Sequence, residues 1–212
     1  MVPEPVTPDE AVPGDPPRPP DLRGRSTADE PVELRRVGAG GSMAPDNAFA
    51  VALLTLWHGV ALTGGVVGFP VDVARSTVGS AIAPVVDGIK AGRSFALALA
   101  QHRHVVGFAL LERGTLDQAH TGTVSLVMVE TSRQRSGQGS RLVQGLLDLA
   151  ATVGIERVQV LVPAGAGLAD FFARFGFREC GRLPGWTRAG NGSEDDALVL
   201  VADVPEVPAA ES

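Results

Sequence analysis

The residues best suited to chemistry in this 212-residue chain are two glycines, Gly137 and Gly139, in a polar segment that begins at Gln134. An apolar run with the pattern of a strand precedes the segment, and an amphipathic run with helical spacing follows it. Backbone N–H groups at a helix start have no partner within the helix, and glycine lets an anion approach the backbone closely. The segment is therefore a candidate phosphate-binding turn with diphosphate as its natural ligand, although such glycines also occur in turns without a ligand.

Two other phosphate-binding motifs do not fit this segment. The P-loop requires a lysine directly after its last glycine, whereas Ser140 follows Gly139 here. The Rossmann fingerprint requires a third glycine, which Arg141 and Leu142 do not supply. Neither motif therefore explains the turn.

The elements that position this turn are predicted from hydrophobic periodicity and from the glycines and prolines that interrupt it. In order they are a strand at 31–37, helices at 48–62 and 73–91, three antiparallel strands between 94 and 130, a helix ending before Gly154, a strand at 156–163, a short helix at 167–175, and strands at 176–183 and 197–204. Asp46 or Asn47 is expected to cap the first helix, and Pro84 to bend or split the second. This order predicts an α+β fold with a strand-helix-strand crossover at its centre.

The two ends of the chain differ in composition from its middle. Nine of the 16 prolines precede Val32, in a stretch with almost no large apolar side chains. Such a stretch cannot bury enough apolar surface to offset its ordering entropy. We expect a disordered tail over residues 1–30, a folded domain over 31–204 and a disordered acidic tail over 205–212.

Composition excludes several classes of function. The net charge of −6 gives no general attraction for nucleic acid or anionic membranes. Cys180 is the single cysteine, so neither an intrachain disulfide nor a multi-cysteine metal site is expected. The first residues lack the basic start and apolar run of a secretory signal, and no apolar run approaches the roughly 20 residues of a spanning helix. We predict a cytoplasmic protein without metal, nucleic-acid or membrane partners.

The turn resembles the coenzyme A loop of the GNAT (GCN5-related) N-acetyltransferases, whose pattern is [QR]-x-x-G-x-[GA]. The residues here are Gln134-Arg135-Ser136-Gly137-Gln138-Gly139. A second family pattern, Phe or Leu, Tyr, three residues and Gly-Phe, is similar to the segment Phe171 to Phe177. The resemblance implies the GNAT fold, which is α+β with a central mixed, mostly antiparallel sheet of about seven strands flanked by about four helices. Gly64 to Phe69 and Pro184 to Trp186 are loosely similar to the tabtoxin-resistance-type acetyltransferases of small molecules.

The resemblance also implies acetyl-CoA as co-substrate and no metal. The main chain of Val127 and Val129 would pair with the pantetheine arm, and Phe172 would lie near the sulfur. The residues implied to surround the pyrophosphate are Gln134, Arg135, Ser136, Gly137, Gln138, Gly139 and Ser140. Phe172 stands where many relatives have the tyrosine that protonates the departing thiolate, and the chain has no tyrosine.

The residue that deprotonates the amine is harder to predict. An amine with a pKa of about 10 is almost fully protonated at neutral pH, so a base or a chain of waters must take up its proton. The positions that correspond to the family's carboxylate hold Thr123 and Ser125, which are not bases near neutral pH. We expect a water wire, with Ser125 and Glu130 as catalytic candidates and Asp117 and His120 as further acceptors.

The acceptor is predicted to be the primary amine of a small molecule, attacking directly in a ternary complex. Trp57, next to His58, and Trp186 are the candidate substrate-binding residues, although Trp57 also suits a packed core. Polyamines, aminoglycosides and protein N-terminal amines remain open as acceptors, and an anionic protein attracts cations. The alternative is a catalytically weak or inactive CoA-binding regulatory module. A homodimer is compatible with the sequence.

Overall fold

The structure is a computed structural model that describes residues 31–102, 104–188 and 193–205. The tail predicted over residues 1–30, and residues 206–212 of the predicted acidic tail, lie outside the described residues. Within the described part, no helix is long and apolar enough to cross a membrane.

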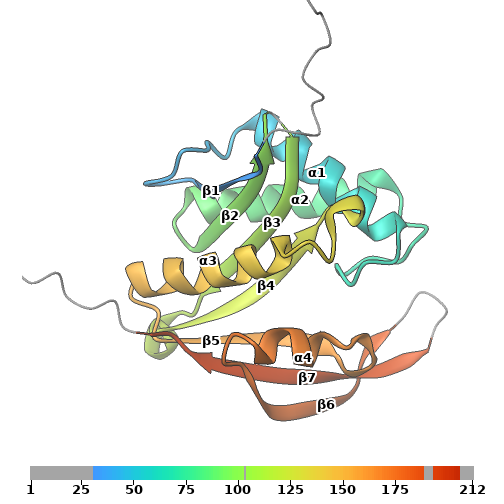
Figure 1. Ribbon diagram of the computed structural model, residues 1–212, viewed down its shortest axis with the longest axis vertical. Coiled ribbons are helices and arrows are strands. Elements are labelled where there is room, and N and C mark those ends of the chain that lie inside the picture. The colour runs from blue at the N-terminus through green and yellow to red at the C-terminus, as the bar shows by residue number, and fades with distance from the viewer. Residues whose placement is uncertain (1–30, 103, 189–192, 206–212) are drawn as a thin grey trace, which may run out of the picture. The chain divides into compact units, whose positions relative to one another are not determined.

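A seven-stranded mixed sheet runs through the domain in the order β1-β2-β3-β4-β5-β7-β6 (Figure 1). All neighbouring strands are antiparallel except β4 and β5, which are parallel. The strands are β1 (Glu33–Val37), β2 (Ser94–Gln101), β3 (His104–Arg113), β4 (Thr121–Val129), β5 (Arg157–Pro163), β6 (Arg178–Arg188) and β7 (Glu194–Asp203). The helices are α1 (Asn47–Leu62), α2 (Arg75–Lys90), α3 (Gln138–Thr152) and α4 (Leu168–Ala173), with 3-10 turns η1 (Leu116–Gln118), η2 (Thr131–Arg133) and η3 (Ala164–Ala166). The predicted fold class is confirmed.

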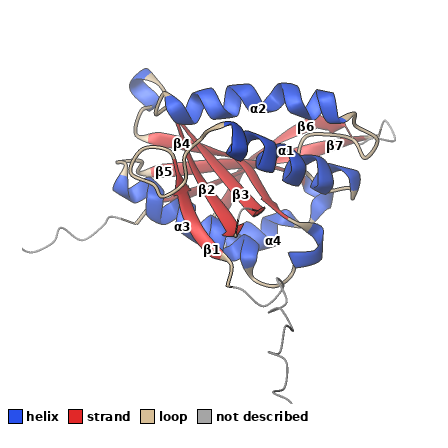
Figure 2. Ribbon diagram, turned by 90° about the horizontal axis from the view of Figure 1, so that it is seen from above, coloured by secondary structure: helices blue, strands red, loops and turns tan. Residues whose placement is uncertain are grey.

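Helices cover both faces of the sheet (Figure 2). The strand side chains alternate between two cores, so that Ala96 and Phe108 pack with α1 and α2. Leu97 and Leu111 pack with α3 and α4 in the other core. The sheet therefore separates one helix pair from the other.

The helix starts agree closely with the periodicity, and of the two effects expected from Pro84, a bend or a split, the split is wrong. The Asp46 carboxylate accepts a hydrogen bond from the Phe49 N–H at 2.9 Å and caps α1. In contrast, Pro84 does not split α2, which is continuous from Arg75 to Lys90. Pro84 and Ser80 are both exposed, so water can satisfy the Ser80 carbonyl, whose helical partner is missing.

The last two strands are longer than predicted. The segment Pro184–Trp186 lies within β6, where the register with β7 shifts between Leu183 and Thr187. Proline lacks a backbone N–H and is tolerated on an edge strand, and β6 is the outermost strand of the sheet. Trp186 therefore projects from an irregular edge strand.

The two parallel strands at the centre of the sheet separate soon after they meet. β4 pairs with β5 only through Thr121–Thr123 and Arg157–Gln159. β4 then continues to Val129 along β3, and β5 continues to Pro163 along β7. Figure 1 shows the two strands diverging beyond their paired end. This opening between β4 and β5 contains the candidate site.

Candidate active site

The inner edge of β4 has main-chain groups directed into the opening. The Glu130 N–H donates to the Val106 carbonyl at 2.8 Å, which makes these two residues a hydrogen-bonded pair of the β3–β4 ladder. Because such pairs alternate along an antiparallel ladder, Val127 and Val129 direct their N–H and C=O groups away from β3. No described strand pairs with β4 on that side beyond Thr123. Both main-chain groups of Val127 and the N–H of Val129 thus form an edge at which a further extended segment can hydrogen bond, while the Val129 carbonyl already accepts from the Gln134 side-chain amide.

The turn after β4 is held in an unusual backbone conformation. Arg135 and Gly137 have φ angles of 60° and 84°, in the left-handed region. The Gln134 side-chain amide donates to the Val129 carbonyl at 3.1 Å, and the Ser136 hydroxyl donates to the Arg133 carbonyl at 2.6 Å. The first bond joins the turn to the end of β4, and the second closes the turn on itself.

Helix α3 begins without a capping side chain. Gly137 is its N-cap residue, and the first main-chain bond of the helix runs from the Arg141 N–H to the Gly137 carbonyl at 3.1 Å. The N–H groups of Gln138, Gly139 and Ser140 precede that bond and so have no partner within the helix. A helix start in this state attracts anions through its free amides and the helix dipole.

The free strand edge and the uncapped helix start line the same cavity, of about 660 Å³, which we call the cofactor cleft. Its far wall is formed by η3 and α4, where the Phe171 ring comes within 3.5 Å of the point at which a Gly139 Cβ would lie. Arg135 and Arg174 are the only charged side chains among the described residues that line it. In a chain of net charge −6, this cleft has a positive lining.

A second cavity of about 380 Å³, which we call the acceptor cavity, continues from the cofactor cleft. The two share lining residues, including Val66, Val127 and Phe171. Ser125 is exposed in the acceptor cavity at a β-bulge, because Leu110 pairs with Leu126 and Leu111 with Val124. The bulge therefore directs the single hydroxyl of this part of β4 into the opening.

Aromatic residues from both faces of the sheet line the acceptor cavity. Trp57 is buried in α1, donates its indole N–H to the Val67 carbonyl at 2.9 Å and packs edge-on against Phe69. Phe172 is buried in α4, edge-on to Phe171 and Phe177 with ring centroids 5.1 and 5.2 Å apart. Trp57 and Phe172 thus form parts of the cavity wall as well as of the two cores.

Other candidate residues lie apart from both cavities. The side chain of Trp186 is 65% exposed and does not line either cavity, although the adjacent Thr187 does. The Glu130 carboxylate accepts a hydrogen bond from Arg133 Nε at 3.1 Å outside both linings. His58 Nε2 lies 3.3 Å from the Val73 carbonyl oxygen, and His58 lines neither cavity.

The remaining polar candidates on and before β4 are not in the site either. The Thr123 hydroxyl accepts a hydrogen bond from the Gln159 amide at 3.1 Å, where β4 and β5 are still paired. Asp117 and His120 precede β4 and therefore lie at the strand end opposite the turn. Of the candidates for proton transfer that carry a hydroxyl or a carboxylate, only Ser125 lines a cavity.

Two parts of the site were not among the predicted residues: Arg174 and the loop between α1 and α2. The Arg174 guanidinium lies 5.0 Å from the Phe171 ring centroid, and its place inside the second motif was the available signal. The loop residues Val66 and Val67 line both cavities, and the Thr63 hydroxyl lies 2.7 Å from that of Thr131. Nothing in the local sequence indicates this contact, because 68 residues separate its partners.

Comparison with known families identifies the class of protein that this architecture defines. Residues 80–184 match the acetyltransferase (GNAT) domain family. The chain belongs to the GNAT acetyltransferase family, an assignment that makes it an acyltransferase with acetyl-CoA as co-substrate. No curated protein matches the chain in sequence. The described residues contain no group of three or more His, Cys, Asp or Glu side chains arranged for a metal ion.

Solved structures share the fold at low sequence identity. One is yncA, a putative acetyltransferase of Salmonella typhimurium with acetyl-CoA, 16% identical, with a TM-score of 0.64 over 86% of this chain and 99% of that one. The ribosomal-protein-S18-alanine N-acetyltransferase of Escherichia coli is 18% identical, with a TM-score of 0.58 over 79% and 95% of the two chains. A putative phosphinothricin N-acetyltransferase is 17% identical, with a TM-score of 0.65 over 82% and 100%.

Proposed function

We propose that the domain over residues 31–204 is an N-acetyltransferase that moves an acetyl group from acetyl-CoA to the primary amine of a small molecule. One observation carries this proposal: the uncapped start of α3 and the free edge of β4 line a single cleft. The uncapped helix start suits a diphosphate, and the strand edge suits the amide groups of a pantetheine chain. The predicted cytoplasmic location is part of the proposal.

The cleft residues fit acetyl-CoA by the type of group that each offers. The N–H groups from Arg135 to Ser140 would surround the diphosphate, with Arg135 and Arg174 adding positive charge. Gln134 would act indirectly, because its side-chain amide is already bonded to the Val129 carbonyl. The main-chain groups of Val127 would hydrogen bond to the pantetheine arm as a neighbouring strand does.

Bound acetyl-CoA supplies a thioester carbonyl that an amine can attack directly, forming the C–N bond and breaking the C–S bond. The amine loses one proton, and the thiolate that leaves takes one up. In this proposal the Val129 N–H polarises the carbonyl, and the Ser125 hydroxyl, directed into the acceptor cavity, exchanges protons with water there. Glu130 is a candidate for the group that finally accepts the amine proton through a chain of waters.

Two observations support alternatives to a small-molecule acetyltransferase: a CoA-binding module and an enzyme with a protein acceptor. Phe172 has no hydroxyl, which favours a CoA-binding module with weak or no turnover. The similarity to a ribosomal-protein-alanine N-acetyltransferase keeps protein N-terminal amines among the acceptors.

A thiol-release assay with acetyl-CoA and a panel of primary amines tests the proposal. The panel contains small amines and a peptide with an N-terminal alanine, and thermal stabilisation by CoA is measured in parallel. We expect thiol release with at least one small amine. Stabilisation by CoA without thiol release from any acceptor would establish the binding module, and release with the peptide alone would establish a protein acceptor.

A further inference from the structure

The acceptor cavity has no ionisable side chain among the described residues that line it. Its wall is made of aromatic and aliphatic side chains, and only three lining side chains carry a polar atom: Trp57, Ser125 and Thr187. This is unexpected for a chain of net charge −6, whose overall charge favours cationic acceptors.

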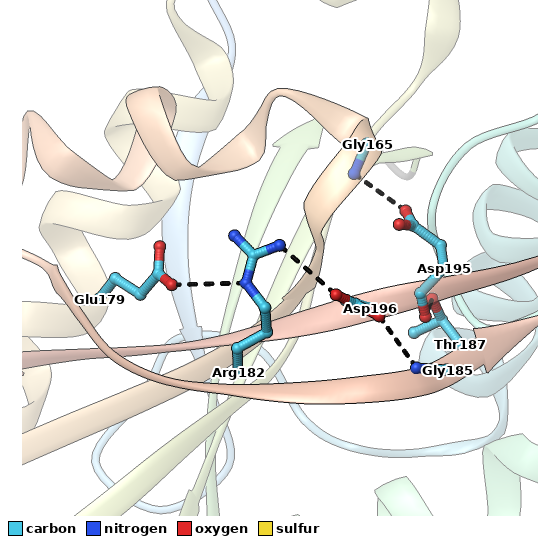
Figure 3. A network of polar contacts seen from close by, with 7 residues as sticks. All are labelled: Gly165, Glu179, Arg182, Gly185, Thr187, Asp195 and Asp196. Atoms are coloured by element: carbon cyan, nitrogen blue, oxygen red, sulfur yellow. Dashed lines mark hydrogen bonds and ion pairs between the residues drawn. The ribbon is translucent and has the colours of Figure 1, made fainter.

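Two of these three polar groups are already used within the protein. The Trp57 indole N–H donates to the Val67 carbonyl at 2.9 Å. The Thr187 hydroxyl donates to the Asp195 carbonyl at 2.9 Å, and the Asp195 carboxylate accepts a hydrogen bond from the Gly165 N–H at 2.9 Å (Figure 3). The Ser125 hydroxyl remains, at the β-bulge of β4.

Two acidic side chains of β7, on the strand that pairs with Thr187, also have partners outside the cavity lining. Asp196 accepts the Gly185 N–H at 3.0 Å and lies 3.4 Å from Arg182, while Glu194 pairs with Arg188 at 2.5 Å (Figure 3 shows the Asp196 contacts). None of these carboxylates lines the cavity. An ammonium group inside it would therefore have no carboxylate partner on the wall.

This lining determines which amines can enter. A second charged group on the acceptor would lose its water without a partner, and an unpaired charge is very costly in apolar surroundings. The same desolvation lowers the pKa of the reacting amine and favours its neutral, nucleophilic form. An apolar lining thus compensates in part for the lack of a carboxylate base beside Ser125.

We propose that the acceptor is a hydrophobic primary amine with a single basic nitrogen on an aromatic or branched apolar body. This proposal rests on the acetyltransferase function proposed above and names its substrate class. Trp57 and Phe69 on the α1 side, with Phe171 and Phe172 on the α4 side, contact such a body from opposite faces of the sheet. A volume of about 380 Å³ suits an acceptor of that size.

The test compares phenethylamine with 1,5-diaminopentane, which is of similar length but carries two charges. Acetyl transfer is followed by thiol release, and binding is followed by thermal stabilisation of the full chain saturated with CoA. We expect kcat/KM to be at least about tenfold higher for phenethylamine, and only phenethylamine to stabilise the CoA complex further. Equal or better use of the diamine would overturn the substrate class and leave the acetyltransferase function intact.

A substitution in the cavity wall tests directly whether this cavity is the acceptor site. Leu161 lines the cavity and is 39% exposed, so Leu161→Asp adds a carboxylate that water can still reach. We expect this variant to shift the ratio towards the diamine by at least about tenfold. Val51→Asp on the exposed surface of α1 is the control and should keep the original ratio.

The two proposals fail in different ways. If no amine releases thiol, the acetyltransferase function fails, while the stabilisation of the CoA complex still decides which amine the cavity accepts. If Leu161→Asp and the parent chain show the same ratio, the cavity is not the acceptor site and the substrate class is wrong.

Discussion

The side-chain amide of Gln134 donates a hydrogen bond to the main-chain carbonyl of Val129, the last residue of β4, at 3.1 Å. The bond joins the turn to the strand, so the free amides of the turn and the free edge of the strand keep a fixed spacing. A ligand with phosphate at one end and an amide chain at the other requires such a fixed spacing.

Replacing Gln134 by glutamate should weaken this connection, because a carboxylate cannot donate to a carbonyl. We expect CoA to bind at least about fivefold more weakly, with a loss of about 1 kcal/mol in stability. Isothermal titration with CoA measures the first effect and urea unfolding the second. Gln118→Glu makes the same charge change in η1, away from the cleft, and should bind CoA as the parent chain does.

Gly137 and Gly154 form a matched pair for separating binding from stability. Both have a left-handed φ, of 84° and 73°, and neither would bring an added Cβ within 4 Å of another group. Alanine at either position should cost about 1 kcal/mol through backbone strain. Only Gly137→Ala should also weaken CoA binding, because Gly154 follows the other end of α3. Equal CoA affinities in the two variants would contradict our assignment of the diphosphate site.

Arg174 is predicted to contribute charge to the cofactor cleft. Arg174→Gln should weaken CoA binding about threefold to tenfold, and the difference should shrink as the salt concentration rises. Arg178→Gln removes an exposed arginine that lies 3.4 Å from Asp203, outside the cleft, and should leave affinity unchanged. Titration with dephospho-CoA shows which phosphate Arg174 serves. A loss that persists without the 3′-phosphate assigns Arg174 to the diphosphate.

Ser125 is predicted to act in proton exchange rather than in cofactor binding. Ser125→Ala should lower kcat by about tenfold or more and leave the affinity for CoA unchanged. Steady-state kinetics with the best acceptor, together with CoA titration, separate the two. A lower affinity for CoA with an unaltered kcat would show that Ser125 is a structural residue of the bulge.

Trp57 should matter for stability far more than Trp186. Trp57→Phe leaves the Val67 carbonyl without its 2.9 Å donor in a buried place, which should cost about 1 to 2 kcal/mol. Trp186→Phe changes a side chain that is 65% exposed, and we expect less than about 0.5 kcal/mol. Urea unfolding measures both. Similar losses in the two variants would mean that the Trp57 hydrogen bond contributes little.

The parts of the site that sequence predicts well are local in the chain. The strand before the turn, the glycines and α3 follow one another directly between Thr121 and Thr152, so periodicity and glycine spacing were sufficient to predict them. In contrast, the strand predicted at 176–183 was expected to end before Pro184 and Gly185. In the structure, β6 continues to Arg188 through a shift in register. Only the partner strand β7 determines that outcome, and sequence spacing does not reveal it.

The residues around the acceptor cavity could not be grouped from the sequence either. Its wall joins Trp57 of α1, Ser125 of β4, Leu161 of β5 and Phe172 of α4, which are far apart in the sequence. Each residue taken alone suits ordinary core packing, and only the separation of β4 from β5 brings them around one space. The absence of charge from that space is therefore a tertiary property.

The early parting of β4 from β5 leaves the protein with an interior sheet edge rather than only the outer edges of β1 and β6. An unpaired edge can add strands from other chains, and proteins normally shield it. In the proposed complex the pantetheine arm would cover this interior edge, so bound acetyl-CoA would complete the sheet as well as supply the acetyl group.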